Sequence, residues 1–137
     1  MVEINVEYEG DLHCRLKHGP SGAEIVTDAP VDNEGKGEAF SPTDLLSAAL
    51  GSCMMTIMGI YARRQQIDLS GSRVRVRKEM VADPIRRVGR FEVLFDLPAH
   101  VDGARRPALE KAAHACPVDR SLHPDVKVEI TFRYGAA

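Results

Sequence analysis

Residues 41–64 read SPTDLLSAALGSCMMTIMGIYARR, and this stretch decides which fold the rest of the chain can adopt. Ser41 is a typical N-cap and Pro42 suits the first helical position. Asp44, three residues after Ser41, resembles the second half of a capping box and places a carboxylate at the positive end of the helix dipole. Apolar residues then recur at helical spacing, namely Leu46, Leu50, Cys53, Ile57 and Tyr61. Further apolar residues flank this row and widen it almost round the helix. The stretch therefore predicts a core helix that other structure must cover on several sides.

The length of the chain limits what can cover this helix. With 137 residues we expect a single domain spanning 1–137. Because so short a chain has little structure to spare, the cover is expected to include a second copy, so the sequence predicts a homodimer. The apolar run 45–60 is shorter than the roughly 20 residues that cross a bilayer, so no membrane association is expected.

Composition excludes several other partners. The chain has 18 basic and 20 acidic residues and a formal net charge of -2, which gives no footprint for nucleic acid or an anionic membrane. Residues 1–8 alternate like a strand, and no charged segment followed by an apolar one resembles a secretory leader. We therefore expect a cytoplasmic protein, in which three cysteines would not form a structural disulfide framework.

The remaining segments predict an α+β domain. Alternating apolar residues indicate extended segments, which are expected at 2–8, 12–16, 23–27, 74–81, 91–97 and 126–134. A surface loop rich in Gly, Pro, Asp and Asn is expected at 28–37. A second helix is expected to start near Arg105 or Pro107 and to end at Ala115, because Pro117 cannot continue it. These elements predict an antiparallel sheet packed on two helices.

Two cysteines are candidates for chemistry. Cys53 lies in the middle of the first helix among small residues that let a ligand approach, whereas Cys116 would lie at the C-terminus of the second helix. The negative end of a helix dipole disfavours a thiolate, so Cys53 is predicted to attack and Cys116 to resolve. Cys14, on a predicted strand, is interpreted as inert core.

A buried thiol has a raised pKa, so Cys53 needs a cationic or hydrogen-bonding partner. The candidates are Arg15, Arg63, Arg64 and Arg120, of which Arg63 and Arg64 are more simply solvated helix-end charges. His114, two residues before Cys116, would point to a different helix face from the thiol. Zinc binding by the cysteines and a histidine lacks any close pair such as C-x-x-C, so no metal or other cofactor is predicted.

The motif at 41–53, the sequence Ala113-His-Ala-Cys-Pro-Val118 and the following Ser121-Leu122 together resemble the OsmC/Ohr superfamily, that is, osmotically inducible protein C and organic hydroperoxide resistance proteins. The resemblance covers nearly the whole chain in element order. It implies an intertwined homodimer with two active sites at the subunit interface, each holding two cysteines of one chain under the long helix. It also implies a thiol peroxidase, in which the first cysteine reduces an organic or lipid-derived hydroperoxide and becomes a sulfenic acid. The second cysteine then closes a disulfide, which a dithiol reductant such as a lipoyl protein reopens.

Two positions depart from the pattern of the peroxidase branches. Those branches carry a glutamate directly after the helix-opening proline, where this chain has Thr43 and offers Asp44 one residue later. That carboxylate orients an arginine that activates the thiolate, and the arginine usually lies in the N-terminal hairpin loop, where this chain reads Glu9-Gly-Asp11. We expect Arg15, on the following strand, to replace it and Asp44 to orient it. The sequence thus resembles the less characterised OsmC-like branch more closely.

Two functions are compatible with these features. The first is an organic hydroperoxide reductase for oxidative stress defence that works through a Cys53 sulfenic acid and a disulfide between Cys53 and Cys116. The second is a non-catalytic or weakly active protein on the same fold that binds a hydrophobic ligand at the dimer interface. Turnover of a hydroperoxide with a dithiol distinguishes the two.

Overall fold

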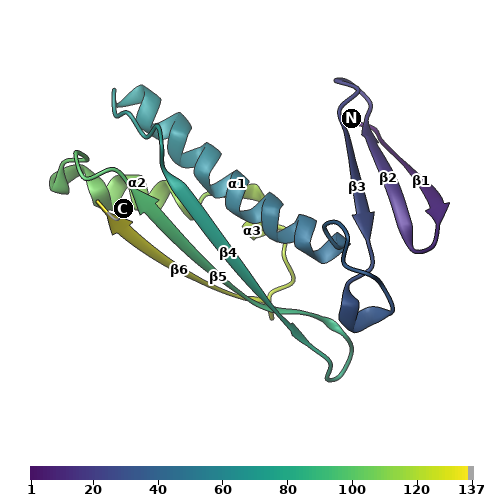
Figure 1. Cartoon of the computed structure of the whole chain (residues 1–137). Helices are drawn as coiled ribbons and strands as arrows, with labels where there is room; N and C mark the ends of the chain where they lie inside the picture. Colours follow the sequence, from purple (N-terminus) through teal and green to yellow (C-terminus); the bar gives the residue numbers. More distant parts are fainter. Residues whose placement is uncertain (136–137) are drawn as a thin grey trace. The chain divides into compact units, whose positions relative to one another are not determined.

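The computed structural model describes residues 1–135 and forms two compact units, Met1–Leu46 and a second unit that begins at Ser47 (Figure 1). Each unit contains one three-stranded sheet, and the α+β class expected from the sequence is confirmed. Whether 1–137 behaves as one domain stays a prediction, and residues 136–137 lie outside the described part of the chain.

The N-terminal unit contains an antiparallel sheet in the order β1-β2-β3. Its strands are β1 (Ile4–Gly10), β2 (His13–His18) and β3 (Glu24–Asp28), followed by the short 3-10 helix η1 (Val31–Asn33). Asp11 and Leu12 turn the first hairpin with positive φ angles of 57° and 64°. All three strands were expected from the alternation of apolar and polar residues.

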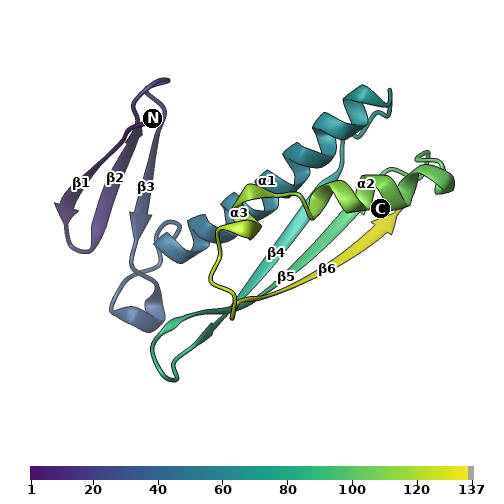
Figure 2. The same ribbon diagram turned by 180° about the vertical axis from the view of Figure 1, so that it is seen from behind.

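The second unit is built on a sheet in the order β4-β5-β6, which helices cover on one face (Figures 1 and 2). Its strands are β4 (Arg73–Val81), β5 (Arg87–Leu97) and β6 (Lys127–Tyr134), and its helices are α1 (Pro42–Arg64), the 3-10 helix η2 (Gly103–Arg105), α2 (Arg106–Ala113) and α3 (Pro117–Arg120). Helix α1 begins at the end of the first unit and continues into the second.

The direction of β6 corrects the expectation of a wholly antiparallel sheet. Strands β4 and β5 form the expected antiparallel hairpin, but β6 pairs with β5 in parallel, with Phe91 opposite Val128 and Phe95 opposite Phe132. Parallel neighbours need a crossover connection, and helices α2 and α3 supply it between β5 and β6. The helices thereby return the chain to the starting end of β5, so β6 must run in the same direction.

Helix α1 packs on the sheet through one row of residues spaced four apart. The fully buried members of this row are Leu50, Met54 and Met58, with Ala62 almost as buried. A Cβ atom at Gly51 would lie 2.7 Å from a methyl carbon of Val76, so the absent side chain allows the helix to approach β4 closely.

Helix α1 is longer than the apolar run 45–60 on which the sequence expectation was based. The helix has 23 residues, and by length and mean hydropathy, 1.6 over its most apolar window, it could cross a membrane. Core helices pass the same test, and a third of that window is buried inside this chain. The apolar surface of α1 therefore exceeds what its own sheet covers.

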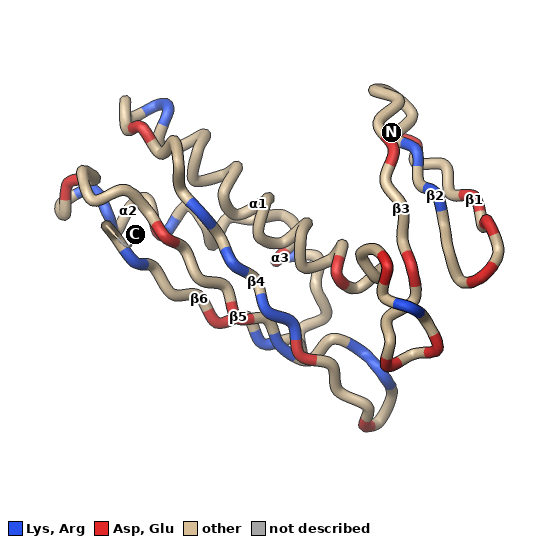
Figure 3. The backbone as a smooth tube through the Cα atoms, in the orientation of Figure 1, with Lys and Arg blue, Asp and Glu red and all other residues tan. Residues whose placement is uncertain are grey.

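Charged residues alternate along the other face of the C-terminal sheet. Figure 3 shows Lys and Arg following one another along β4, opposite acidic residues on β5. At the centre, Arg90 lies 2.6 Å from Glu129, 2.7 Å from Glu92 and 3.4 Å from Glu79. These carboxylates hold the pKa of Arg90 above its usual range, through the hydrogen bond with Glu129 first. Arg77 of β4 also lies 3.6 Å from Glu92 of β5, so acidic side chains accompany the basic ones on this face of the sheet.

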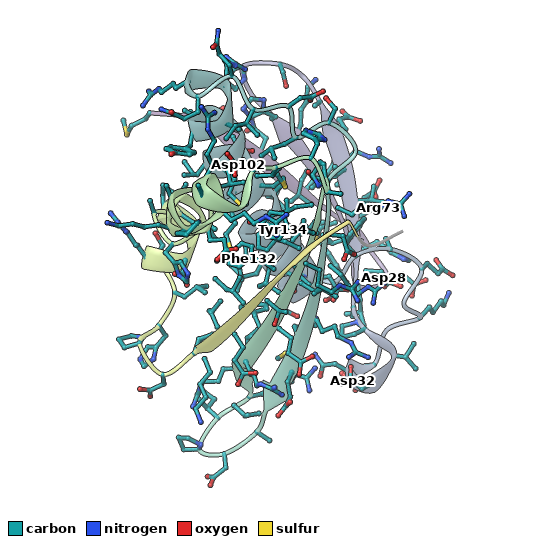
Figure 4. All side chains as sticks on the ribbon, turned by 90° about the vertical axis from the view of Figure 1, so that its left-hand side faces the viewer. Asp28, Asp32, Arg73, Asp102, Phe132 and Tyr134 are labelled. Atoms are coloured by element: carbon teal, nitrogen blue, oxygen red, sulfur yellow. The ribbon has the colours of Figure 1, made fainter. Side chains whose placement is uncertain are left out.

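Aromatic contacts fix β6 to its neighbours. The rings of Phe95 and Phe132 stack with centroids 5.0 Å apart, and Figure 4 labels Phe132 and Tyr134 along β6. The Tyr134 hydroxyl donates a hydrogen bond of 3.0 Å to Glu110 of α2, and the Arg106 guanidinium lies 4.0 Å from the centre of the Tyr134 ring. Helix α2 is thereby tied to the last strand.

Truncation of the buried row should destabilise the fold. We expect Leu50→Ala to lower the free energy of unfolding by about 2–5 kcal/mol, because it leaves a cavity at a fully buried site. Leu50→Met, which nearly conserves volume, should cost less than about 1.5 kcal/mol. Urea unfolding monitored by circular dichroism measures both, and equal losses would contradict the packing described.

Candidate redox site

Two cysteines far apart in the sequence come into contact in the C-terminal unit. Cys53 lies in the middle of α1, and Cys116 lies between α2 and α3. Their side chains are hydrogen-bonded, with the thiol of Cys116 as the donor to the sulfur of Cys53. Both thiols are free, with no disulfide between them. The fold thus brings together the two residues that the sequence assigns to a redox pair.

Cys116 occupies a different helix position from the one expected. Helix α2 ends at Ala113 rather than Ala115, and Cys116 is the N-cap of the short helix α3. Its sulfur accepts a hydrogen bond of 3.4 Å from the backbone N–H of Asp119. Pro117 both stops α2 and starts α3, since proline suits the first position of a helix. The expectation that Cys116 faces the negative end of a helix dipole was therefore wrong.

The pKa of Cys116 is nevertheless raised above the usual value of a thiol. Burial is the largest cause, and the hydrogen bond that the Cys116 thiol donates to Cys53 adds to it. The N–H groups of Asp119 and Val118 act in the opposite direction but do not outweigh these two. Cys116 is thus held as a protonated thiol by its burial and its partner.

The two thiols also differ in access. Cys116 is fully buried, whereas Cys53 is partly exposed. A reagent from solvent can therefore meet the Cys53 sulfur first, with a protonated thiol already in contact behind it. This arrangement suits a first sulfur that attacks and a second that supplies a thiol to the oxidised product.

Asp44 forms a reciprocal cap with Ser41 at the start of α1. The backbone N–H of Ser41 donates to Asp44 Oδ2 at 2.8 Å, and the backbone N–H of Asp44 donates to Ser41 Oγ at 3.1 Å. The capping box expected from the sequence is confirmed. The further expectation, that Asp44 orients an arginine, stays a prediction.

Arg15 lies on β2 between two carboxylates of the N-terminal unit. Its Nε atom is 3.1 Å from Glu9 and its Nη1 atom is 3.4 Å from Glu24. Both contacts raise the pKa of Arg15, and the hydrogen bond with Glu9 contributes most. The sequence reasoning missed Glu9 and Glu24 as partners, although antiparallel pairing of charged alternating strands could have indicated them. The role of Arg15 as activator of Cys53 stays a prediction.

The structure gives the burial of the remaining cysteine, histidine and arginine candidates but assigns them no further role. Cys14 is partly buried on β2, and His114 is exposed at the end of α2. Arg63 and Arg64 are exposed at the end of α1, as expected of solvated helix-end charges, and Arg120 is exposed in α3.

The sequence profile described as OsmC-like protein matches residues 35–131, which include both thiols. The chain belongs to the OsmC-like family. None of the curated proteins matches the chain significantly. Membership in the family supports a role in redox or stress chemistry.

Solved structures agree with this assignment. The chain shares 45% identity and a TM-score of 0.91 with a protein from Psychrobacter arcticus provisionally described as an osmotic stress induced and detoxification response protein, over 97% of this chain and 96% of that one. An organic hydroperoxide resistance protein OsmC from Legionella pneumophila matches at 17% identity and a TM-score of 0.73, over 96% of each chain. The organic hydroperoxide resistance protein OhrB of Bacillus subtilis matches at 15% identity and a TM-score of 0.72, over 97% of this chain and 98% of that one. The last two show the shared fold.

The contact between the thiols predicts that substitution of Cys53 changes the pKa of Cys116. We expect Cys53→Ala to lower the pKa of Cys116 toward its usual value, because the acceptor of its S–H is lost. Cys53→Ser, which retains an acceptor, should leave the pKa closer to that of the wild type. The rate of alkylation of Cys116 against pH, followed by mass spectrometry in a Cys14→Ser background, measures the shift. An unchanged or higher pKa in Cys53→Ala would contradict the hydrogen bond.

Proposed function

We propose that the protein is a cysteine-based thiol peroxidase that reduces organic hydroperoxides in oxidative stress defence. The observation that carries this proposal is the contact between a partly exposed Cys53 and a buried, protonated Cys116. Membership in the OsmC-like family supports the same chemistry, and two proteins of this fold bear names that refer to organic hydroperoxide resistance.

The reaction divides into two thiol steps. The Cys53 thiolate attacks the terminal peroxide oxygen, the O–O bond breaks, and the alkoxide takes a proton to leave as the alcohol. Cys53 is then a sulfenic acid, oxidised by two electrons. The sulfur of Cys116 displaces the hydroxyl group of that sulfenic acid, which departs as water with the proton of Cys116, and a disulfide forms between the two cysteines. Because the two side chains already touch, this condensation needs little movement.

A reductant must reopen the disulfide. A dithiol, such as a lipoyl group carried by another protein, exchanges with the disulfide and itself becomes oxidised, which returns both cysteines to the thiol form. We propose the cytoplasm as the site of this cycle, because such reductants keep thiols reduced there.

Activation of Cys53 is proposed to depend on Arg15. A guanidinium near a sulfur favours the thiolate, and carboxylates fix the direction of the guanidinium. Glu9 and Glu24 hold Arg15 in this way within its sheet, so they are better supported as orienting groups than Asp44, whose carboxylate caps α1.

Substitution of each cysteine separates the steps. We expect Cys53→Ser to abolish consumption of cumene hydroperoxide with a dithiol such as dihydrolipoamide. Cys116→Ser should still reduce one equivalent of peroxide and then stop at the Cys53 sulfenic acid, which a dimedone-type probe labels. Stopped-flow peroxide consumption and intact-mass analysis make the two measurements.

Cys14→Ser is the matched control, since Cys14 lies on a strand of the other unit and should leave turnover unchanged. No turnover with monothiol or dithiol donors, together with no disulfide after peroxide treatment, would reject the peroxidase. Binding of a hydrophobic ligand without turnover would then favour the second function.

We also propose that the protein is a homodimer whose second copy covers apolar surface that one chain leaves exposed. One face of the N-terminal sheet carries the partly exposed side chains of Ile4, Val6, Tyr8 and Ile25, each at least half exposed in the single chain. A three-stranded sheet gains stability chiefly by burying such a face. The large apolar surface of α1 also supports a homodimer, because a second copy could cover it.

Charge on that face should separate the subunits. We expect Val6→Lys to shift the protein to monomers in sedimentation velocity, because a lysine cannot be buried unpaired against a second copy. Asn5→Lys, which places the same charge on the opposite face of β1, should leave the dimer intact. A wild-type chain that sediments as a monomer would reject the dimer.

A further inference from the structure

A histidine and two carboxylates meet at one end of the N-terminal sheet, outside the redox site. His13 begins β2, Asp28 ends β3, and the two residues are direct partners across the antiparallel ladder. Side chains of such partners project from the same face a few ångströms apart. Figure 4 labels Asp28 at this end of the sheet.

The loop after β3 brings Glu38 to the same place. The backbone N–H of Asp28 donates to the carbonyl of Phe40 at 3.1 Å, and the backbone N–H of Glu38 donates to Asp28 Oδ2 at 2.9 Å. The loop is tight, because a side chain at Gly35 would overlap the carbonyl of Ala29. Glu38 is therefore positioned by backbone contacts rather than by its own side chain.

Asp28 is the part of this cluster that most needs a cation. Its side chain is 1% exposed, and its Oδ1 atom receives no hydrogen bond from any residue in the described part of the chain. A buried carboxylate oxygen without a donor is costly unless a positive charge compensates it. The pKa of Asp28 is held below its usual range, mainly by the N–H of Glu38, so the group is a carboxylate rather than an acid.

Two of the three distances between the ligand atoms match the edges of a tetrahedral metal site better than they match ionic hydrogen bonds. The Nε2 atom of His13 lies 3.4 Å from Asp28 Oδ1 and 3.4 Å from Glu38 Oε2, and all three ligand atoms lie within 4.8 Å of one another. Charge-assisted N–H···O bonds are usually about 2.7–2.9 Å long. Metal–ligand bonds of about 2.0–2.2 Å in a tetrahedron place neighbouring ligand atoms about 3.3–3.6 Å apart.

We propose that His13, Asp28 and Glu38 bind one divalent transition-metal cation, with Zn²⁺ as the best match. An imidazole beside two carboxylates suits zinc and its neighbours, whereas Mg²⁺ and Ca²⁺ prefer oxygen ligands alone. Two carboxylates also balance the charge of a divalent ion. Glu38 is 59% exposed, so an ion can enter from solvent and the fourth position is left to water.

The site would join two strands to the loop that follows them. A cation that binds the folded state but not the unfolded chain stabilises it in proportion to the logarithm of its concentration. Zn²⁺ should therefore raise the melting temperature of the metal-free protein, and a chelator should reverse the increase.

Zinc titration of the full-length chain tests the site directly. A Cys14→Ser, Cys53→Ser, Cys116→Ser background removes the thiols as competing ligands, and calorimetry should then show one Zn²⁺ per chain. Co²⁺ should give the visible absorption of a tetrahedral ion without a sulfur charge-transfer band. Binding of Mg²⁺ or Ca²⁺ as tightly as Zn²⁺ would overturn the assignment to a transition metal.

Glu38→Gln and Glu34→Gln form a matched pair of variants. Both make the same chemical change at an exposed position of one loop, but Glu34 is not part of the cluster. We expect Glu38→Gln to weaken Zn²⁺ binding at least about tenfold and Glu34→Gln to leave it unchanged. Asp28→Asn should weaken it further, and the Glu38 variant keeps the test valid where loss of the buried carboxylate impairs folding. No Zn²⁺ binding by the thiol-free protein, or equal binding by both glutamine variants, would overturn the proposal in favour of a protonated His13 bridging the two carboxylates.

Discussion

The packing of α1 on β4 and β5 is the constraint on which the C-terminal unit depends. Because the buried residues recur every four positions from Leu50 to Ala62, they fix the rotation of the helix about its axis. The missing side chain at Gly51 sets how closely the helix approaches β4. Once rotation and height are fixed, the position of Cys53, one residue before the buried Met54, follows. The packing of α1 therefore positions Cys53, and the redox pair then requires only that another segment place Cys116 beside it.

Cys116 reaches that position through the crossover between β5 and β6. The crossover contains α2 and α3, and the cysteine lies at their junction, where its sulfur accepts the N–H of Asp119. A helix N-terminus alone would favour a thiolate there. Burial and the hydrogen bond to Cys53 outweigh it, so the pKa of Cys116 is raised and Cys116 stays a protonated thiol. The sequence argument also made Cys116 the poorer nucleophile, but it placed this residue at the C-terminus of the second helix, whereas Cys116 is the N-cap of α3.

Features set by neighbouring residues could be predicted from the sequence, and features set by the path of the chain could not. Helix α1 was predictable because its cap and period are local, and Asp44 and Ser41 form the expected box. The direction of β6 was not, since apolar alternation is the same in parallel and antiparallel strands. Pro117 was interpreted only as a stop, although proline equally begins a helix. The pair of thiols was found because two motifs of one family carry it, whereas no motif unites His13 with Asp28 and Glu38.

The register of β2 explains why the sequence did not indicate the cluster of His13, Asp28 and Glu38. It also places His13 on the same face of the sheet as Arg15. In β2, His13 and Arg15 project from one face of the sheet, while Cys14 and Leu16 project from the other. The first face gathers the carboxylates that surround both basic residues, and the second gathers the apolar side chains proposed to meet another copy. If β2 slipped by one residue against its neighbours, its side chains would exchange faces, and its charged residues would then lie among apolar side chains. The same register positions the apolar side chains of the proposed dimer face and the polar groups of the other face. A substitution that shifts the register should therefore alter the contacts on both faces.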